Sequence, residues 1–232
     1  MPLRDALFRP VRAGNAFEET VERLVQAIRL GVVGPGERLP AERDLAARLG
    51  VSRVTLREAI RSLQDAGYVE SRRGRYGGTF VNSPLPAPAP DRRVDAGELA
   101  DALTLRWAVE TGAAQCAAGR ALGPVERRNL LARLVECRDA SVDSYRRKDS
   151  RLHLAIAEAT GSPSLTAAVA DARTRVNALL DRIPLLPPNL AHSNEQHEEI
   201  VTHIVAGDPE AARRAMAEHL DGTALLLRGF LS

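Results

Sequence analysis

Apolar residues recur every three or four positions in three stretches of the first 81 residues, which is the spacing of helices that bury one face. The three stretches are 16–30, 41–49 and 53–66. Two short runs rich in strand-forming residues, 68–70 and 78–81, flank a turn that contains glycine and arginine. The pattern therefore predicts a first unit of three helices followed by a hairpin.

A proline-rich segment, 82–92, follows this unit. Four of the nine residues of Asn82–Pro90 are proline. Proline has no backbone N–H and restricts the residue before it, so neither a helix nor a central strand fits here. We expect an extended linker that divides the chain into a unit over 1–81 and a second unit over 93–232.

The second unit shows helical spacing and no convincing strand. Helices are predicted near 95–121, 124–147, 149–160, 164–183, 191–206 and 209–230. Glycine and proline residues break the pattern at 161–163, 184–188 and 207–209. Helices joined by short connections pack antiparallel, so the chain is predicted to be mainly α, with an all-α antiparallel helical bundle as its second unit.

Charge is unevenly distributed between the two units, although the whole chain carries a formal charge of only +2. Residues 1–83 contain 14 Arg and 10 Asp or Glu, which gives +4. Residues 84–232 contain 18 Lys or Arg and 20 Asp or Glu, which gives −2. This asymmetry indicates that the first unit is the one that contacts a polyanion.

Cysteine usage and the lack of long apolar runs indicate the compartment. Cys116 and Cys137 form no CxxC pair, and both lie in apolar helical patterns, so we expect buried free thiols. The sequence has no signal-peptide core and no apolar run of 18 residues. These features predict a cytoplasmic protein with no membrane partner.

The stretch 53–66 has two distinct faces. Its apolar side chains follow the i, i+3, i+4, i+7 spacing and should face the core: Leu56, Ala59, Ile60 and Leu63. Arg53, Arg57 and Arg61 lie four residues apart on another face. A helix with such an arginine stripe can enter the major groove of DNA, about 12 Å wide, with the residues at its N-terminus near the base edges.

A stripe of charged residues on a helix is usually only a face exposed to solvent. Whether this one binds DNA must therefore be judged from the charges on neighbouring elements. Arg43 from the preceding helix adds to the stripe, and Arg72, Arg73 and Arg75 add charge from the hairpin turn. Basic residues from three separate elements of an 81-residue unit favour DNA binding.

The segment GERLPAERDLAARLGVSRVTLREAIRSLQDAGYVESRRGRYGGTFV, together with residues back to Phe17, resembles the DNA-binding domain of GntR-type regulators. The resemblance implies a winged helix-turn-helix. It assigns DNA contact to Arg43, Ser52, Arg53, Thr55 and Arg57. It places Arg73 and Gly74 at the wing tip, in the minor groove. Val54 departs from the polar residue of some relatives and offers a thymine methyl group only apolar contact.

Histidines of the second unit fall at spacings that suit a metal site. Asp149 and His153 lie one turn apart on one helix face. His197 and His219 lie ten residues before and eleven after Gly207-Asp208. They stand level, roughly 15–17 Å from that turn, if the two helices form an antiparallel hairpin. Three imidazoles and a carboxylate can hold Zn²⁺ or a similar ion. Spacing alone leaves open that these histidines cap helices or lie on the surface.

Two segments, DSRLHLAIAEATGSPSL and EQHEEIVTHIVAGDPEAARRAMAEHL, resemble the FCD-type ligand-binding domain of the FadR-like GntR subfamily. LRWAVETGAAQCAA, at 105–118, resembles an early helix of that domain. Many members hold a divalent metal with one Asp and three His at matching positions, which are here Asp149, His153, His197 and His219. The resemblance implies a divalent metal cofactor, and for three imidazoles and a carboxylate we expect Zn²⁺, with Ni²⁺ or Mn²⁺ as alternatives. At about 100° per residue, His192 and His203 fall on other faces than His197 and are expected at the surface.

The same resemblance implies the chemistry of the effector. Small organic acids bind beside the metal in this family, and Arg106 could donate a charge-assisted hydrogen bond to such a carboxylate. Arg106 could equally pair with Glu110, one helical turn further on, in a purely structural role. The fatty-acyl-CoA branch of the subfamily lacks the metal set, which argues against an acyl-CoA ligand.

Together these features predict a transcription regulator, most simply a repressor, and not an enzyme. A homodimer would place two recognition helices on a palindromic double-stranded DNA operator, and a small carboxylate effector would shift its affinity. The alternative is a metal-dependent hydrolase fused to a DNA-binding domain, because three His and one Asp can activate water. The sequence contains no HExxH motif and no evident general base to support that alternative.

Overall fold

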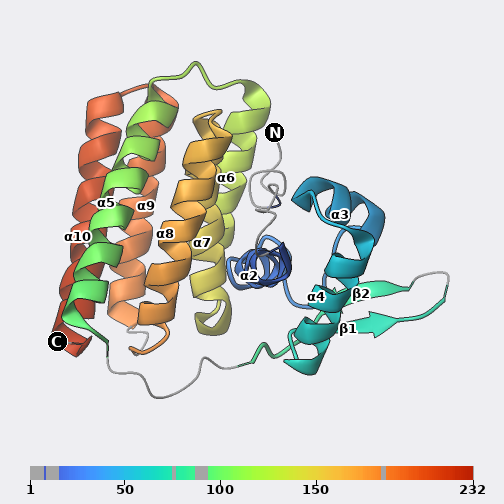
Figure 1. Cartoon of the computed structure of the whole chain (residues 1–232). Coiled ribbons are helices and arrows are strands. Elements are labelled where there is room, and N and C mark those ends of the chain that lie inside the picture. The colour runs from blue at the N-terminus through green and yellow to red at the C-terminus, as the bar shows by residue number, and fades with distance from the viewer. Residues whose placement is uncertain (1–7, 9–15, 75–76, 87–93, 184–186, 232) are drawn as a thin grey trace. The chain divides into compact units, whose positions relative to one another are not determined.

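The computed structural model describes residue 8 and residues 16–74, 77–86, 94–183 and 187–231. The chain folds into two compact units, over residues 2–88 and 89–232. Both are mainly helical, as predicted, and strands occur among the described residues as a single hairpin in the first unit (Figure 1). Most of the predicted linker and Arg75 lie outside the described residues.

The first unit consists of three helices and a hairpin. Its elements are α2 (Ala16–Arg29), α3 (Glu42–Leu49), α4 (Arg53–Asp65), β1 (Val69–Arg72) and β2 (Gly78–Val81). These bounds lie within two residues of the predicted ones. Helix α4 packs against α2 and α3 through its predicted apolar face, which is buried as expected. The small core contains Leu24, Ile28, Leu45, Leu49, Leu56, Ile60 and Leu63.

The turn between α3 and α4 is determined by two residues. Gly50 ends α3 with φ 66°, a left-handed conformation that glycine adopts at little cost. Ser52 is the N-cap of α4, and its Oγ accepts a hydrogen bond from the Thr55 amide at 3.0 Å. The start of α4 and the orientation of its first turn are therefore encoded locally.

Backbone hydrogen bonds to residues 37–39 hold the hairpin against the rest of the first unit. Strands β1 and β2 are antiparallel, with Val69 opposite Val81 and Arg72 opposite Gly78. On the other edge of β2, the Val81 amide donates to the Glu37 carbonyl at 3.0 Å, and the Leu39 amide donates to the Thr79 carbonyl at 2.8 Å. Because β2 is paired on both edges, the hairpin is held in a defined position on its own unit.

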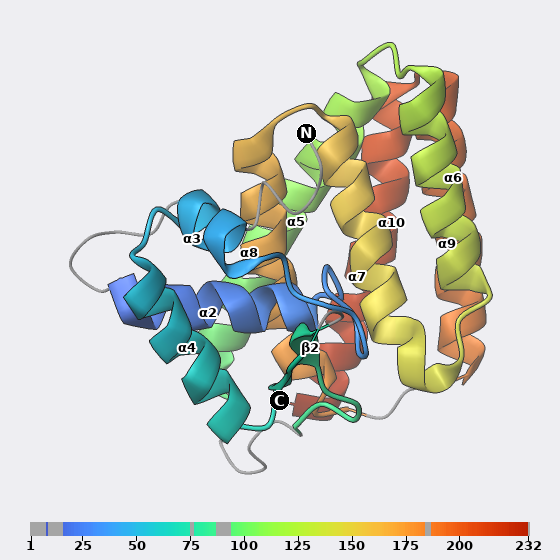
Figure 2. The ribbon, with the colours of Figure 1, turned by 90° about the vertical axis from the view of Figure 1, so that its right-hand side faces the viewer.

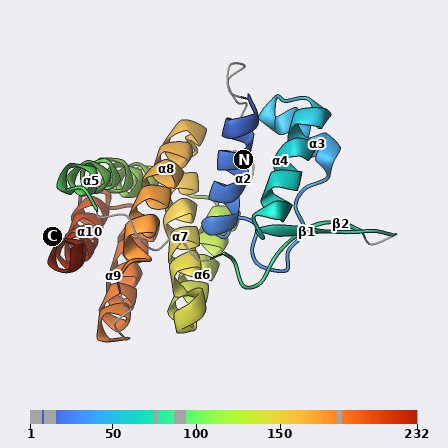
Figure 3. The same cartoon turned by 60° about the horizontal axis from the view of Figure 1, so that its bottom comes forward.

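The second unit is a bundle of helices (Figures 2 and 3). Its helices are α5 (Ala96–Ala118), α6 (Pro124–Arg138), α7 (Val142–Ala159), α8 (Pro163–Leu180), α9 (Pro187–Ala206) and α10 (Pro209–Leu231). Proline opens four of them, at the first-turn position where a missing N–H costs no helical hydrogen bond. Several prolines that seemed only to break helices therefore also start them.

Helix α5 has one exposed face and contacts most of the other helices of the bundle with the rest of its surface. It packs against α7, α8, α9 and α10. Its inward positions are largely alanine, which lets the neighbouring helices approach closely: Ala102, Ala113, Ala114, Ala117 and Ala118. One apolar core joins α5 to α6, α7, α9 and α10 around Leu152, Ile156 and Ile200, and a second joins α5 to α8 and α10 around Leu103, Val176 and Leu227.

Two predictions about the second unit are wrong. The single helix expected over 124–147 is two helices, because α6 ends at Arg138 and α7 begins at Val142. Neither glycine nor proline marks this break. Tyr145 and Asp149, which follow the break, lie on the buried face of α7. Cys137 is buried as expected, but Cys116 is exposed, on a largely uncharged outer face of α5. Helical periodicity in an alanine-rich helix does not show which apolar face is covered.

No helix among the described residues is both long enough and apolar enough to cross a membrane.

Candidate nucleic-acid interface and metal centre

The outer face of α4 carries the predicted arginine stripe. Arg53, Arg57 and Arg61 are all exposed, whereas Leu56, Ala59 and Ile60 on the other face are buried. Val54 lies in the first turn of the helix, and 66% of it is exposed, although a valine normally packs against protein. The first turn of α4 thus presents a cation and an apolar side chain outward, next to the capping pair Ser52 and Thr55.

Ion pairs differ among the arginines predicted to contact DNA. Arg57 Nε donates to Glu42 Oε2 at 2.8 Å, which links α4 to the start of α3. Arg43 Nε donates to Asp44 Oδ1 at 3.3 Å. Arg53 has no ion pair with any residue that the structure describes. Exposed ion pairs stabilise a protein by only about 0–1 kcal/mol, so a phosphate group can displace them.

The hairpin turn exposes the predicted wing tip. Arg72 lies over the Phe80 ring, 4.5 Å from its centroid, and its Nε donates to Glu70 Oε1 at 2.8 Å. Arg73 and Gly74 follow and are both exposed. Gly74 has φ 103°, a conformation that side-chain-bearing residues rarely adopt. Arg73 therefore extends from a tight turn at the end of the hairpin, with no partner among the described residues.

The four predicted metal ligands converge at one buried point of the bundle. Asp149 and His153 come from α7, His197 from α9 and His219 from α10. One ligand atom from each lies within 4.8 Å of the others. His197 Nε2 is 3.3 Å from both His153 Nε2 and His219 Nε2. The predicted level placement of His197 and His219 across the Gly207 turn is therefore confirmed.

Neighbouring side chains determine which imidazole nitrogen carries the proton. His153 Nδ1 contacts Glu110 Oε2, and His219 Nδ1 lies 3.1 Å from Gln196 Oε1. Carboxylate and amide oxygens only accept hydrogen bonds, so both Nδ1 atoms are assigned the proton. His197 Nδ1 faces the Cys137 thiol at 3.9 Å. The Nε2 atoms of His153 and His219 are then left with lone pairs that point at the cluster.

The cluster contains too few N–H protons for its acceptor atoms to hydrogen-bond one another. Asp149 Oδ1 lies 3.3 Å from His197 Nε2 and 3.6 Å from His153 Nε2, and it is a further acceptor. If His197 Nε2 is protonated, it can satisfy only one of these neighbours well. Converging imidazole nitrogens and a carboxylate oxygen, all buried, are the donor set that a divalent cation requires. The residues present therefore fit a metal ion.

Electrostatics favours the ligand-competent protonation states. Burial lowers the pKa of His197, and burial together with the neighbouring histidines holds the pKa of His219 well below its usual range. Burial acts to raise the pKa of Asp149, but Arg173 and His153 outweigh it and hold that pKa well below its usual range. Neutral His197 and His219 imidazoles and an ionised carboxylate are the forms that bind metals.

Arg106 and Glu110 form a buried pair beside this cluster. Arg106 Nε donates to Glu110 Oε1 at 3.3 Å, and both residues are almost fully buried. Burial acts to raise the pKa of Glu110, but His153, Arg106 and Arg173 together lower it to about 2. Of the two roles predicted for Arg106, the structure contains the pair with Glu110. Contact with an effector remains a prediction.

Arg173 on α8 is a member of the site that the sequence analysis missed. It is 0% exposed, contacts Asp149 Oδ2, and donates to Ser150 Oγ at 3.3 Å. Its Nη1 lies 3.8 Å from Glu110 Oε1. One Asp149 oxygen thus faces Arg173, and the other faces the histidines. The available signal was an arginine in line with Val169 and Val176 on the apolar face of α8, because buried arginines are nearly always paired.

The other two histidines of the second unit lie at the surface, as predicted. His192 is exposed, and its Nδ1 lies 3.7 Å from Glu195. His203 is partly exposed and lies 3.7 Å from Glu199. Neither takes part in the buried cluster.

Both units match known protein families. Residues 16–81 match the family described as bacterial regulatory proteins, gntR family. Residues 101–222 match the FCD domain. The first match covers the helices and hairpin of the first unit, and the second covers all four candidate metal ligands.

Two relatives and one solved structure extend the similarity over both units. The chain is 35% identical over 228 residues to a protein assigned as the L-lactate dehydrogenase operon regulatory protein of Escherichia coli K12, covering 91% of this chain and 84% of that protein. It is 32% identical over 231 residues to the HTH-type transcriptional repressor NanR of Salmonella newport, covering 92% and 85%. Escherichia coli McbR/YncC, at 20% identity, has a similar fold, with TM-score 0.57 over 93% of this chain and 98% of that one.

The buried histidines make a prediction about pH. Their folded-state pKa lies below the unfolded value of about 6.5, so the stability they contribute is complete above that pH and is lost as the pH falls below it. In EDTA, the free energy of unfolding from urea titrations should fall between pH 7 and pH 5. The decline should be shallower in His219→Gln, by up to about 1.4 kcal/mol per pH unit.

His192→Gln is the matched control, because His192 is exposed, and it should follow the wild type at every pH. The lowered pKa values of Asp149 and Glu110 act below this window. Burial raises the pKa of Glu158 to about 7, but this group is common to all three proteins, so the difference between their slopes reports His219. Identical slopes for wild type and His219→Gln would contradict the assignment of a neutral, buried His219.

Proposed function

The chain belongs to the GntR family of bacterial regulatory proteins, with an FCD domain as its second unit, and we propose that it is a repressor controlled by a small organic acid bound beside a divalent metal. Like these relatives, it is a DNA-binding transcription regulator and not an enzyme. The alternative of a metal-dependent hydrolase has no support among them. The observation that carries the proposal is the convergence of four buried metal-ligating atoms in the FCD domain.

For DNA contact, we propose the residues that the family resemblance assigns. Arg53, Ser52 and Thr55 at the start of α4, with Arg57 and Arg43 beside them, would lie in the major groove. Arg73 and Gly74 at the hairpin tip would enter the minor groove. The exposure of Arg53 and Arg73, and their lack of partners among the described residues, supports this assignment. Two copies in a homodimer would contact the half-sites of a palindromic operator.

For the metal, the donor set favours Zn²⁺, with Ni²⁺ or Mn²⁺ as alternatives. Three imidazoles suit Zn²⁺ and Ni²⁺, whereas Mg²⁺ and Ca²⁺ prefer all-oxygen sites. Asp149, His153, His197 and His219 would hold the ion, and Glu110, Gln196 and Arg173 would orient three of these four ligands. A bound ion would supply an electrophilic centre for a carboxylate oxygen.

For the effector, buried hydrogen-bond donors without partners support an anion. Nη1 of Arg106 and Nη1 of Arg173 have no hydrogen-bond partner among the described residues, although both are buried. An unpaired buried donor is costly, and a carboxylate would satisfy both charge and hydrogen bonding. The relative from Escherichia coli is named for an operon of L-lactate dehydrogenase, and lactate is itself a small carboxylate.

For control, we propose that the acid favours one of two arrangements of the dimer. A ligand shifts such an equilibrium only by its difference in affinity for the two states. Because the acid would contact residues of α5, α7, α8 and the α9–α10 hairpin together, its binding free energy depends on how these helices are packed. A change in that packing is the means by which the FCD domain would change operator affinity.

The DNA contacts are tested by Arg53→Ala. Loss of a bidentate base contact costs roughly 1–3 kcal/mol per half-site, so operator affinity should fall at least about tenfold. Affinity is measured by fluorescence anisotropy at fixed salt, with an operator obtained by in vitro selection. Binding to unrelated DNA should change much less, because phosphate contacts supply it.

Arg214→Ala serves as a control, because it removes one exposed positive charge from α10 and leaves the first unit intact. It should bind the operator like the wild type. If Arg53→Ala also binds like the wild type, α4 does not contact bases through its first turn.

The metal site is tested by chelation. A ligand that binds only the folded state stabilises it by mass action, so EDTA should lower the Tm and Zn²⁺, Ni²⁺ or Mn²⁺ should restore it. His197→Ala and His219→Ala should each lower the metal content and abolish the response of DNA binding to a carboxylate effector. DNA binding without effector should survive in both, because the winged unit has its own core.

His203→Ala is the control for the loss of a histidine from the same helix, and its metal content should match the wild type. Protein that elemental analysis finds metal-free when purified without chelator, with a Tm indifferent to EDTA and to added metal, would contradict the proposal.

A further inference from the structure

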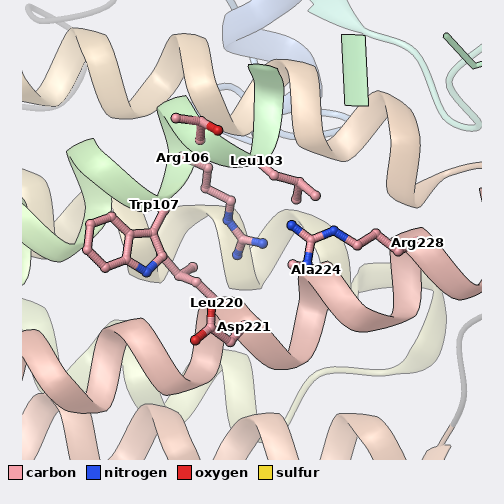
Figure 4. Close-up of a pocket in the computed structure, with 8 residues that line it drawn as sticks. Leu103, Arg106, Trp107, Leu220, Asp221, Ala224 and Arg228 are labelled. Atoms are coloured by element: carbon pink, nitrogen blue, oxygen red, sulfur yellow. The ribbon is translucent and has the colours of Figure 1, made fainter. Parts of the chain in front are cut away.

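A pocket lies between α5 and α10, apart from the four candidate metal ligands. Its volume is about 260 Å³, and none of the four ligands lines it. Figure 4 shows residues of α5 on one side and of α10 on the other, with two guanidinium groups directed into the space between them. Ligand sites for drug-sized molecules usually span about 300–1,000 Å³, so this pocket suits a small ligand.

The inner end of the pocket carries a buried, incompletely paired cation. Arg106 is 2% exposed, and its Nε is bonded to Glu110 at the base of the side chain. Its Nη1 has no hydrogen-bond partner among the described residues. The guanidinium reaches the pocket between Trp107 and Arg228 (Figure 4). A buried donor that lacks a partner marks a place where an acceptor from a ligand would bind favourably.

Arg228 supplies a second cation from the opposite helix. Its guanidinium points towards Arg106 in Figure 4, and it forms no ion pair with any residue in the described part of the chain. Asp221 is the one acidic residue that lines the pocket, and it is exposed. The pocket lining carries two guanidinium groups and one carboxylate, and Glu110, which does not line the pocket, already pairs with Arg106. Arg228 is therefore the cation left for a ligand carboxylate, and Asp221 would repel a second carboxylate.

The rest of the lining is mostly apolar. Leu103 from α5 and Leu220 and Ala224 from α10 contribute hydrocarbon surface. Trp107 lies on the α5 side with 43% of its surface exposed, although it is the largest apolar residue of the chain. A flat indole at the mouth of a cationic pocket offers a face for an apolar or aromatic group. The pocket thus joins a charged end to an apolar wall.

We propose that this α5–α10 pocket binds a small monocarboxylate with an apolar or aromatic body. The carboxylate lies between Arg106 and Arg228, and the body lies against Trp107 and Leu220. The pocket shares Arg106 with the effector site proposed above, so it deepens that proposal, but it needs no metal. Binding here depends on Arg228, which lies outside the metal-ligand set, and the two proposals can therefore fail separately.

The chain contains a single tryptophan, so its fluorescence reports this pocket directly. The full-length protein is titrated with benzoate, and with benzamide as a neutral molecule of the same shape, in EDTA and again with Zn²⁺. Benzoate should give a saturable change in Trp107 emission in both conditions. Benzamide should bind at least about tenfold more weakly, because a charge-assisted hydrogen bond is lost.

Arg228→Gln should weaken benzoate binding by about tenfold or more, whereas Arg214→Gln, which removes an exposed charge elsewhere on α10, should leave it unchanged. Arg228 is exposed, so the substitution should not unfold the bundle, and an unchanged Tm checks this. Equal affinity for benzoate and benzamide would overturn the proposal, as would equal affinity in wild type and Arg228→Gln.

The comparison of titrations in EDTA with titrations in Zn²⁺ distinguishes the pocket proposal from the metal-centred effector site. Benzoate binding that appears only with Zn²⁺ and is unaffected by Arg228→Gln would overturn the pocket proposal and leave the metal-centred effector site standing. Binding that is equal in EDTA and Zn²⁺ and is lost in Arg228→Gln supports the pocket, even in a protein that elemental analysis shows to hold no metal.

Discussion

Three imidazoles and a carboxylate meet at one buried point of the bundle, and together they lack the protons to hydrogen-bond one another. His153 Nδ1 contacts Glu110, and His219 Nδ1 contacts Gln196. The Nε2 lone pairs of the two histidines therefore point at Asp149 and His197. Burying converging acceptors without a partner is costly. A shared divalent cation would remove that cost, because each of the converging atoms could serve as one of its ligands.

Several local features of the fold bring these side chains together. The Gly207 turn sets α9 and α10 antiparallel, which brings His197 opposite His219. The break between α6 and α7 turns Asp149 inward, and α5, lined with alanine, approaches closely enough to place Glu110 against His153. Arg173 from α8 neutralises the second oxygen of Asp149. Five helices of the second unit, α5, α7, α8, α9 and α10, thus contribute to a single charged centre, and a ligand bound there would be sensitive to their packing.

The sequence predicted the parts of this arrangement that local patterns encode. Helix α4 begins at its predicted cap, Ser52, and the level placement of His197 and His219 followed from counting residues to the turn. The division between α6 and α7 was missed because neither glycine nor proline marks it. The available signal was the pair of capping residues Asp139, at the end of α6, and Ser141, at the start of α7. Arg173 was missed because its role depends on a partner 24 residues away in another helix. Periodicity likewise could not show that the Cys116 face of α5 is uncovered.

X-ray absorption at the metal edge tests the central claim most directly, on protein purified without chelator. We expect a bound divalent ion whose first shell contains three imidazoles and at least one oxygen, with one imidazole fewer in His219→Ala. Addition of a small carboxylate should change the oxygen part of the shell and leave the imidazole part unchanged. A shell without imidazole, or one that includes sulfur from Cys137, would contradict a centre built from Asp149, His153, His197 and His219.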